Sequence, residues 1–363
     1  MKIQDYIKRE INESLSRDLK AQLLDIINSD TISDNVAAKM IRVYNHESVN
    51  IDNIIKHFNY VGLGKNSDEL IDFLRHDNHD FLKEYSDIVT QGDYITVKEL
   101  LSNDNIYDLL MKKYPTIPRD LIRKLAILNY PDNEGIARGK FEILLDMFLD
   151  DITAGNTGSA DVNTSQYKFE LKASGARMGS KSHSPVNIDL YIKTVLSENN
   201  IKYNAKNCLS NESAVNDTYE QLSSCMDPKS AFIEMMRAVF NQYTITTTVN
   251  GSKLQVTGYP NILCDIDDLY DKVFKNGKFN ARLFKRVQGC IAIAVYSQME
   301  GWDYMMIFKG KDSKNVAERG DYFFIDNKEA KDINELYDDN RFNLSKGGKD
   351  DNFDKYSLLT ATR

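Results

Sequence analysis

Cysteine is scarce in this chain of 363 residues, which contains only four and no C-x-x-C pair. The four cysteines lie far apart, so the sequence predicts reduced thiols with no special structural role and does not favour a zinc ribbon. Reduced thiols favour a cytoplasmic location, which is the host cytoplasm if the source is viral. The positions are Cys208, Cys225, Cys264 and Cys290.

Long apolar runs and an excess of basic residues are also lacking. No stretch of about 18 apolar residues occurs, so the sequence predicts no membrane span. The first residues begin an amphipathic pattern rather than a signal peptide. With 46 basic against 54 acidic residues, the formal net charge of -8 argues against a general nucleic-acid coat protein. It does not argue against a nuclease, because local charge governs the encounter with DNA.

The chain is long enough for two or three domains, and its composition is that of a globular protein. Residues 1–125 show helical periodicity almost throughout and predict a helical domain for recognition or assembly. Three of the six prolines, Pro115, Pro118 and Pro131, mark its end. Residues 130–330 are expected to form the main domain, with an insertion at about 197–228. Residues 331–363 are expected to be a polar C-terminal tail that a partner orders.

The most informative feature is a strand pattern at residues 167–173. Positions 167, 169, 171 and 173 are apolar or aromatic, while positions 168, 170 and 172 are charged. Such alternation is typical of a half-buried strand, and it puts Glu170 and Lys172 on one face. The same pattern is also expected of an exposed strand whose outer face is merely charged.

Asp161 is expected to join this face through a hairpin. Residues 159–162 predict a short strand, and residues 163–166 predict a turn. If Val162 pairs with Tyr167, Asp161 lies opposite Lys168 and diagonal to Glu170. Diagonal neighbours are roughly 7–8 Å apart, close enough for two carboxylates to converge on one cation.

A helix predicted at residues 139–149 supplies a third carboxylate. Glu142 and Asp146 lie one turn apart, beside the apolar stripe of this helix, so Glu142 can point along the sheet towards the strand carboxylates. The stripe consists of Phe141, Leu144, Leu145 and Phe148.

Three carboxylates and a lysine suit metal-dependent phosphodiester hydrolysis. Magnesium takes oxygen ligands, commonly one or two carboxylates with water and substrate phosphate. The ion lowers the pKa of its water and neutralises charge on the phosphate. A lysine on the same face can orient the attacking water or stabilise the pentavalent phosphorus.

These residues resemble the PD-(D/E)xK nuclease superfamily. The resemblance covers about residues 135–180 by motif, and it extends loosely to about 325 by the order of the predicted elements. It implies an α/β fold with a mixed central sheet flanked by helices, a restriction-endonuclease-like core, here preceded by an all-helical N-terminal domain. It also implies Mg²⁺, with Mn²⁺ as a substitute. Ala160 stands where the superfamily often has proline. The residues that carry the resemblance are Gly139, Glu142, Asp161, Glu170, Lys172 and the segment 173–177.

The resemblance assigns a role to each acid. Asp161 and Glu170 become metal ligands, Lys172 becomes the catalytic lysine and Glu142 becomes the accessory acid on the first helix and a third candidate ligand. DNA is the expected partner, bound by basic residues in two segments: the small, polar segment 174–184 and an acid-free stretch near 272–286. The expected DNA-binding residues are Arg177, Lys181, Lys275, Lys278, Arg282, Lys285 and Arg286.

Other patterns complete the expected core. The sequence predicts helices at 188–196 and 231–240, a hairpin at 244–249 and 254–259 around Asn250-Gly251, and strands at 290–297, 303–308 and 322–325. The strand at 303–308 is expected to pair with the one at 290–297.

Two functions of different classes fit these patterns. The first is a magnesium-dependent DNA endonuclease, and the second is a non-catalytic DNA-binding or virion assembly protein on the same fold. Other enzymes, including RNases, stay open. Either could act as a homodimer or bind a protein partner through the helical N-terminal part. The chain is rich in Asn, Asp, Lys, Ile and Tyr, as an AT-rich genome would produce, and this suggests a phage source.

Overall fold

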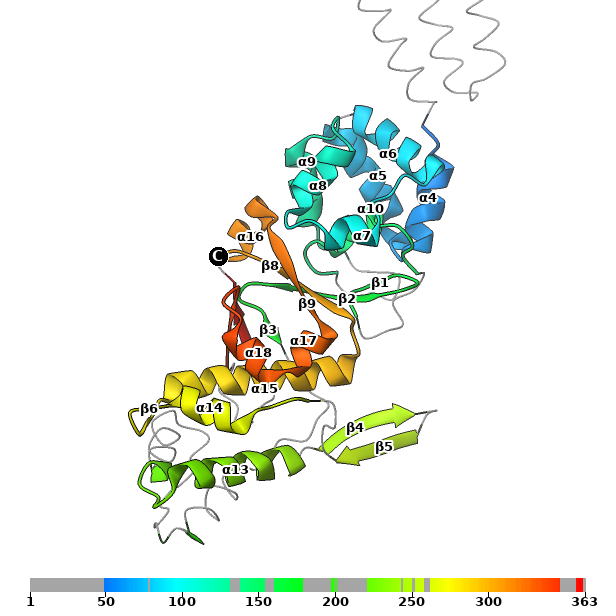
Figure 1. The fold of residues 1–363 in the computed structure, drawn as a ribbon. Helices are drawn as coiled ribbons and strands as arrows, with labels where there is room; N and C mark the ends of the chain where they lie inside the picture. Colours follow the sequence, from blue (N-terminus) through cyan, green and yellow to red (C-terminus); the bar gives the residue numbers. More distant parts are fainter. Residues whose placement is uncertain are drawn as a thin grey trace, which may run out of the picture. The chain divides into compact units, whose positions relative to one another are not determined.

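The structure is a computed structural model that describes two compact units of a mixed α/β protein (Figure 1). The first unit comprises Met1–Leu100 and Tyr107–Gly155, and the second comprises Leu101–Ile106 and Asn156–Arg363. The contacts therefore divide the chain near residue 155, whereas the sequence predicts a boundary between 125 and 130. The described residues are 49–77, 79–130, 138–153, 160–178, 197–198, 200, 221–242, 244–249, 252–257, 262–346 and 357–361.

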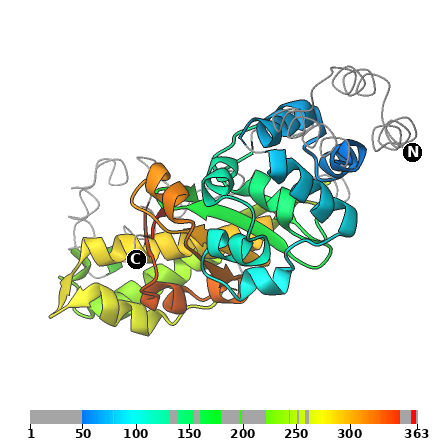
Figure 2. The same ribbon diagram turned by 90° about the horizontal axis from the view of Figure 1, so that it is seen from above.

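Helices make up most of the described part of the first unit (Figure 2). The α-helices bury apolar side chains, as the helical periodicity of residues 1–125 predicts; residues 1–48 lie outside the described residues. Asn50 caps the N-terminus of α4, where its side chain accepts a hydrogen bond from the Asn53 N–H at 3.0 Å. The elements are α4 (Ile51–Tyr60), η1 (Gly64–Asn66), α5 (Ser67–Asp77), α6 (His79–Gln91), α7 (Val97–Leu101), α8 (Ile106–Lys113), α9 (Arg119–Ala126) and α10 (Glu142–Phe148).

A four-stranded mixed sheet forms the centre of the second unit. Its order is β1-β2-β8-β9, and its two central strands, β2 and β8, run parallel while the outer pairs are antiparallel. Parallel neighbours need a crossover connection, and the chain between them contains the long helix α15 (Ala281–Glu300). The strands are β1 (Val162–Asn163), β2 (Lys168–Ala173), β8 (Tyr304–Phe308) and β9 (Tyr322–Asp326).

Helix α15 replaces the strand predicted at 290–297, so that prediction was wrong. The run is apolar on every side because this part of the helix is buried all round, and an apolar run alone does not separate a buried helix from a buried strand. The boundaries of the helix follow ordinary capping. Asn280 accepts the Leu283 N–H at 3.1 Å, and Gly301 ends the helix in the left-handed conformation with φ 64°.

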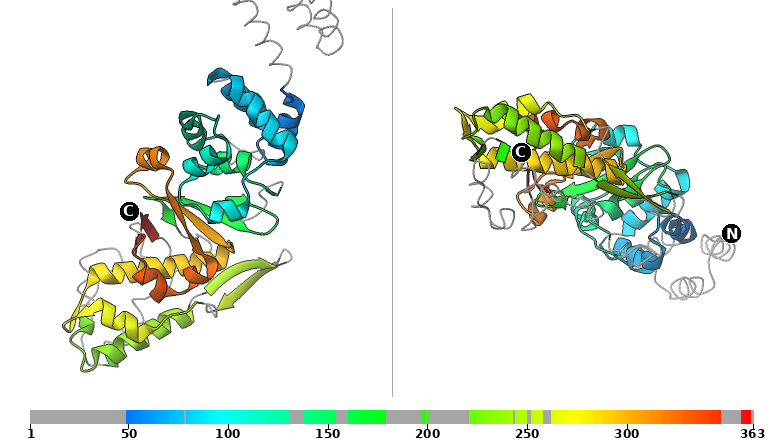
Figure 3. Two further views of the ribbon diagram at one scale, coloured as in Figure 1. Left: turned by 45° about the horizontal axis from the view of Figure 1, so that its top comes forward. Right: turned by 90° about the horizontal axis from the view of Figure 1, so that it is seen from below.

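Several other predictions are confirmed. Strands β8 and β9 lie where residues 303–308 and 322–325 predict them, although β8 pairs with β2 and β9 instead of with 290–297. The predicted hairpin is present as β4 (Thr244–Val249) and β5 (Ser252–Thr257), the yellow-green pair in Figure 3, whose turn lies outside the described residues. Helix α13 (Pro228–Gln242) contains the predicted 231–240. The helix predicted at 188–196 and most of the predicted insertion at 197–228 also fall outside the described residues.

Three further short elements are described between β5 and α15. These are α14 (Ile266–Val273), β6 (Phe274–Lys275) and β7 (Lys278–Phe279).

The described part of the predicted polar tail belongs to the fold. Strands β10 (Asn343–Lys346) and β11 (Ser357–Thr360) form a second sheet with β3 (Arg177–Met178), in which Leu344 and Leu359 are buried. Gly289 of α15 allows the close approach of this sheet, because a Cβ there would lie 2.6 Å from the Ser345 nitrogen. The remaining helices described in the second unit are α16 (Ser313–Arg319), α17 (Asn327–Lys331) and α18 (Ile333–Asp338).

Candidate functional site

The pairing of β1 with β2 sets the position of Asp161. Val162 pairs with Phe169 and Asn163 pairs with Lys168, so the predicted partner of Val162, Tyr167, was wrong by two residues. Because the side-chain period of a strand is two, a two-residue shift keeps every residue on its predicted face. The Leu171 N–H donates to Asp161 Oδ2 at 2.8 Å, which fixes the carboxylate against β2.

Glu170 lies in the middle of β2 and is only 2% exposed. Helix α15 covers its face of the sheet, and the Tyr296 hydroxyl of that helix donates a hydrogen bond to Glu170 Oε1. The Lys172 ammonium forms an ion pair with the same oxygen. The alternative of an exposed strand with a merely charged outer face is therefore wrong for Glu170.

Lys172 joins the two carboxylates. Its Nζ lies 3.6 Å from Asp161 Oδ2 while it also contacts Glu170. The side chains of Lys172 and Asp161 are 18% and 28% exposed, so solvent reaches them while Glu170 lies deeper. Three of the four residues predicted to form the site therefore converge in the structure.

The electrostatics of this cluster favour an added positive charge. Burial raises the pKa of Glu170, and the nearby Asp161 carboxylate raises it further, whereas the Lys172 ammonium and the Tyr296 hydrogen bond lower it. Burial, and then the negative charge of Glu170, raise the pKa of Tyr296, so its hydroxyl stays protonated and donates. Two carboxylates against one lysine leave a formal charge of about -1 when all three are ionised.

One oxygen of the cluster has a place for a ligand. Glu170 Oε2 is buried, and no described residue forms a hydrogen bond to it. Buried polar atoms are nearly always satisfied, so a metal ion, a water or a substrate group is expected at this oxygen. With Asp161 it forms a pair of carboxylates of the kind that Mg²⁺ binds, with water and phosphate oxygens completing the coordination. Across the described part of the chain, no group of three or more His, Cys, Asp or Glu is placed to hold a metal ion.

Glu142, the fourth predicted residue, belongs to the first unit. It occupies the first turn of α10, and its Oε2 lies 3.9 Å from Arg138 Nη1. The same guanidinium nitrogen lies 3.6 Å from Asp146 Oδ2. Gly139 makes room for this arrangement, because a Cβ there would collide with Glu142 Oε1. The convergence of Glu142 with the strand carboxylates stays a prediction.

The predicted DNA-binding residues after β2 are described in part. Gly175 turns the chain with φ 90°, a left-handed conformation that favours glycine, and Arg177 follows on β3 with its side chain exposed. Lys181 lies outside the described residues.

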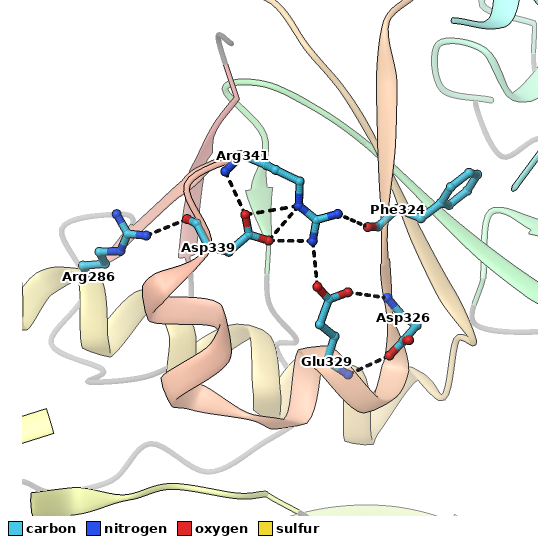
Figure 4. A network of polar contacts seen from close by, with 6 residues as sticks. All are labelled: Arg286, Phe324, Asp326, Glu329, Asp339 and Arg341. Atoms are coloured by element: carbon cyan, nitrogen blue, oxygen red, sulfur yellow. Dashed lines mark hydrogen bonds and ion pairs between the residues drawn. The ribbon is translucent and has the colours of Figure 1, made fainter. Parts of the chain in front are cut away.

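The second basic stretch divides into exposed and engaged side chains. Lys275, Lys278 and Arg282 are exposed, and Lys285 is half-buried. Arg286 instead donates to the Asp339 carbonyl at 2.8 Å, in a network where Arg341 binds Asp339, Glu329 and the Phe324 carbonyl (Figure 4). This network ties α15 to β9 and α17, so Arg286 has a structural role.

The sequence does not indicate Tyr296 as a residue of the site. This residue lies within the run 290–297, which the sequence predicts to be a strand. A helical interpretation would have placed it on a long buried helix, but no local signal links it to Glu170, which is 126 residues away.

No family model, no curated protein and no solved structure matches this chain. None of the helices in the described ranges is long and apolar enough to span a membrane.

Proposed function

We propose that this protein is a metal-dependent endonuclease that hydrolyses DNA phosphodiester bonds at the cluster of Asp161, Glu170 and Lys172. The observation that supports the proposal best is that Asp161 Oδ2 and Glu170 Oε1 both pair with Lys172 Nζ, with Glu170 buried at the base. A buried acid with one unsatisfied oxygen next to a lysine is a costly arrangement that stability alone does not favour.

The fold is consistent with this proposal. The cluster lies on a central strand of a mixed sheet, where β2 has neighbours on both sides and α15 covers one face. Such a sheet holds the side chains more rigidly than a loop would. This is the arrangement implied by the resemblance to PD-(D/E)xK nucleases, and we propose that the second unit has that restriction-endonuclease-like core.

The chemistry assigns a task to each residue. A bound Mg²⁺ would supply an acidified water and neutralise charge on the phosphate. Asp161 and Glu170 would hold the ion, and Glu142 would be the accessory acid only if it reaches them. Lys172 offers a point charge to the phosphate oxygens, where negative charge grows in the transition state. Water adds to phosphorus, one ester P–O bond breaks, and the leaving oxygen takes up a proton.

In this proposal, exposed basic side chains bind the phosphates of the DNA. Arg177, Lys275, Lys278 and Arg282 are exposed and of the sign that binds phosphates. Such contacts fix the position of a duplex without reading its bases.

The test is cleavage of supercoiled plasmid, linear duplex, branched DNA, single-stranded DNA and RNA with Mg²⁺, Mn²⁺ or EDTA. We expect metal-dependent cleavage of DNA that is lost in Glu170→Gln, Lys172→Met and Asp161→Asn. The matched controls are Glu318→Gln and Lys314→Met, which change an exposed ion pair of 3.8 Å on α16 and should cleave like the wild type.

Two outcomes would reject the proposal. Cleavage that survives Glu170→Gln would place the chemistry elsewhere. Binding of DNA without metal, together with no cleavage of any substrate, would favour the non-catalytic assembly protein instead.

A further inference from the structure

The two oxygens of Glu170 are in different environments. Oε1 accepts the Tyr296 hydroxyl and also pairs with Lys172, whereas Oε2 is buried without a hydrogen-bond partner among the described residues. A carboxylate that rotates freely would offer either oxygen to a ligand. Here two donors fix one oxygen and leave the other available.

Tyr296 is the better fixed of the two donors. It is buried on α15, between Val295, which is fully buried, and Ser297, whose hydroxyl donates to the Ala294 carbonyl at 2.8 Å. The helix packs on the face of the sheet that carries Glu170, against Met305 and Ile325, the paired residues of β8 and β9. A tyrosine ring in such a setting has little rotamer freedom, so its hydroxyl position is well defined.

The charges of the two donors differ in their effect on a cation. Lys172 carries a positive charge that would repel a metal ion at the same carboxylate, and it also pairs with Asp161. The Tyr296 hydroxyl is neutral, so it can keep its hydrogen bond to Oε1 when a cation binds. Groups that bind the outer oxygen of a metal ligand orient that ligand and tune its affinity.

We infer that Tyr296 is a positioning residue of this site: it holds Glu170 Oε1 and thereby presents Oε2 to the metal ion. The inference rests on the proposed function, because it requires that Glu170 bind a divalent cation. It adds a residue from a distant helix to the site, and it couples the packing of α15 on the sheet to the affinity for metal.

The experiment is a titration of the full chain with Mn²⁺, in which electron paramagnetic resonance measures the free ion. Tyr296→Phe removes the hydroxyl and keeps the ring. We expect it to weaken Mn²⁺ binding by about 10- to 100-fold, the usual effect of losing such a partner of a metal ligand. Glu170→Gln should abolish binding at this site.

The matched control is Tyr322→Phe. Tyr322 is a buried tyrosine of the same sheet. It lies on β9 and pairs with Phe308 of β8, whereas Glu170 pairs with Met305 of β8. Phe308 and Met305 are three residues apart on one strand, so Tyr322 lies on the face opposite to Glu170. This variant should bind Mn²⁺ within about twofold of the wild type if orientation of Glu170 is what matters. Circular dichroism melting of each variant checks the fold.

A kinetic measurement separates positioning from general damage. For Tyr296→Phe the Mg²⁺ concentration that half-saturates cleavage should rise by the same factor as the Mn²⁺ dissociation constant, while kcat at saturating Mg²⁺ returns to nearly the wild-type value. A lower kcat with unchanged metal dependence would overturn the inference, because it would assign Tyr296 to the chemical step.

The remaining outcomes distinguish the inference from the proposed function. If Tyr296→Phe binds Mn²⁺ like the wild type while Glu170→Gln loses binding, the inference is wrong and the proposed function stands. If the wild type binds no Mn²⁺, with or without duplex DNA, both are wrong.

Discussion

Each unit of this protein gathers two carboxylates around one cation, and the two clusters differ in exposure and in the cation they use. In the first unit the cation is Arg138, and its side chain and that of Asp146 are 4% and 2% exposed. Glu142 is 12% exposed. This cluster is closed to solvent, as is expected of a structural ion pair.

In the second unit the cation is Lys172, and the cluster opens to solvent through Lys172 and Asp161. Only Glu170 is deeply buried. An arginine offers a rigid, permanently charged fork that suits a fixed pair, whereas a lysine is a movable point charge. The comparison indicates that similar charges can serve stability in one unit and a ligand site in the other.

The largest effect on stability is expected when Arg138 is removed from its cluster with Glu142 and Asp146. Arg138→Met leaves Asp146 as a buried carboxylate without its guanidinium, which should destabilise the first unit by about 3–5 kcal/mol. Because the two units need not unfold together, the measurement is hydrogen exchange at the amides of α10. Arg123→Met, at an exposed pair of 3.3 Å with Asp120, is the matched control and should cost less than about 1 kcal/mol. If Arg138→Met and Arg123→Met destabilised the first unit equally, the buried pair would not differ in strength from the exposed one.

The corresponding change in the cluster of Asp161, Glu170 and Lys172 should affect mainly activity. Lys172→Met is expected to lower cleavage by about 100- to 1000-fold, since it removes a charge directed at the transition state. Its effect on stability should be smaller than that of Arg138→Met, because the Lys172 side chain is 18% exposed and burial already disfavours the charged form of Glu170. Single-turnover cleavage and hydrogen exchange at α15 measure the two effects. If Lys172→Met were strongly destabilised but still active, Lys172 would have a structural role and not a catalytic one.

Burial of His57 in the first unit should make the stability of that unit depend on pH. Burial lowers the pKa of His57, which stacks on Tyr94 at 5.1 Å, from 6.5 to about 4. The unfolded chain therefore takes up a proton that the folded unit excludes, and stability falls as the pH drops from 6.5 towards 4. Between pH 7 and pH 5 the loss should be about 2 kcal/mol. Hydrogen exchange at α4 measures this loss, and His57→Gln should flatten it. A slope that is unchanged in that variant would assign the pH dependence to other groups.

The smallest effect is expected at a lysine of the second unit that contacts two exposed aspartates. Lys272 lies 2.6 Å from both Asp268 and Asp338, but these acids are 43% and 64% exposed. Lys272→Met should cost less than about 1 kcal/mol and leave Mn²⁺ binding unchanged. This result would show that two acids and a lysine are not sufficient, and that the burial of Glu170 distinguishes the site. Tighter Mn²⁺ binding or an additional Mn²⁺ site in this variant would show that Asp268 and Asp338 also hold the ion, and would contradict the claim.

The local part of the site could be predicted from the sequence. Alternation along residues 167–173 puts Glu170 and Lys172 on one face, since strand side chains alternate with a period of two. The register of Asp161 was wrong by two residues, yet its face was right for the same reason. The confirmed strands β8 and β9 likewise have short, bounded apolar patterns.

The remainder depends on contacts between distant segments. An apolar run does not reveal whether helix or strand buries it, so α15 was predicted incorrectly, and Tyr296 was missed with it. The Glu142 pattern fits a site acid and a structural acid equally well. Its contact with Arg138 places it in the ion-pair cluster of the first unit, and the sequence pattern does not reveal that contact.

The most direct test of the central claim is anomalous diffraction from crystals of the protein soaked in Mn²⁺. We expect a peak about 2.1 Å from Glu170 Oε2 and from an Asp161 oxygen. That peak should be absent from crystals of Glu170→Gln. A peak that lies instead on the Glu142 and Asp146 carboxylates of the first unit, or no peak at either cluster, would contradict the account.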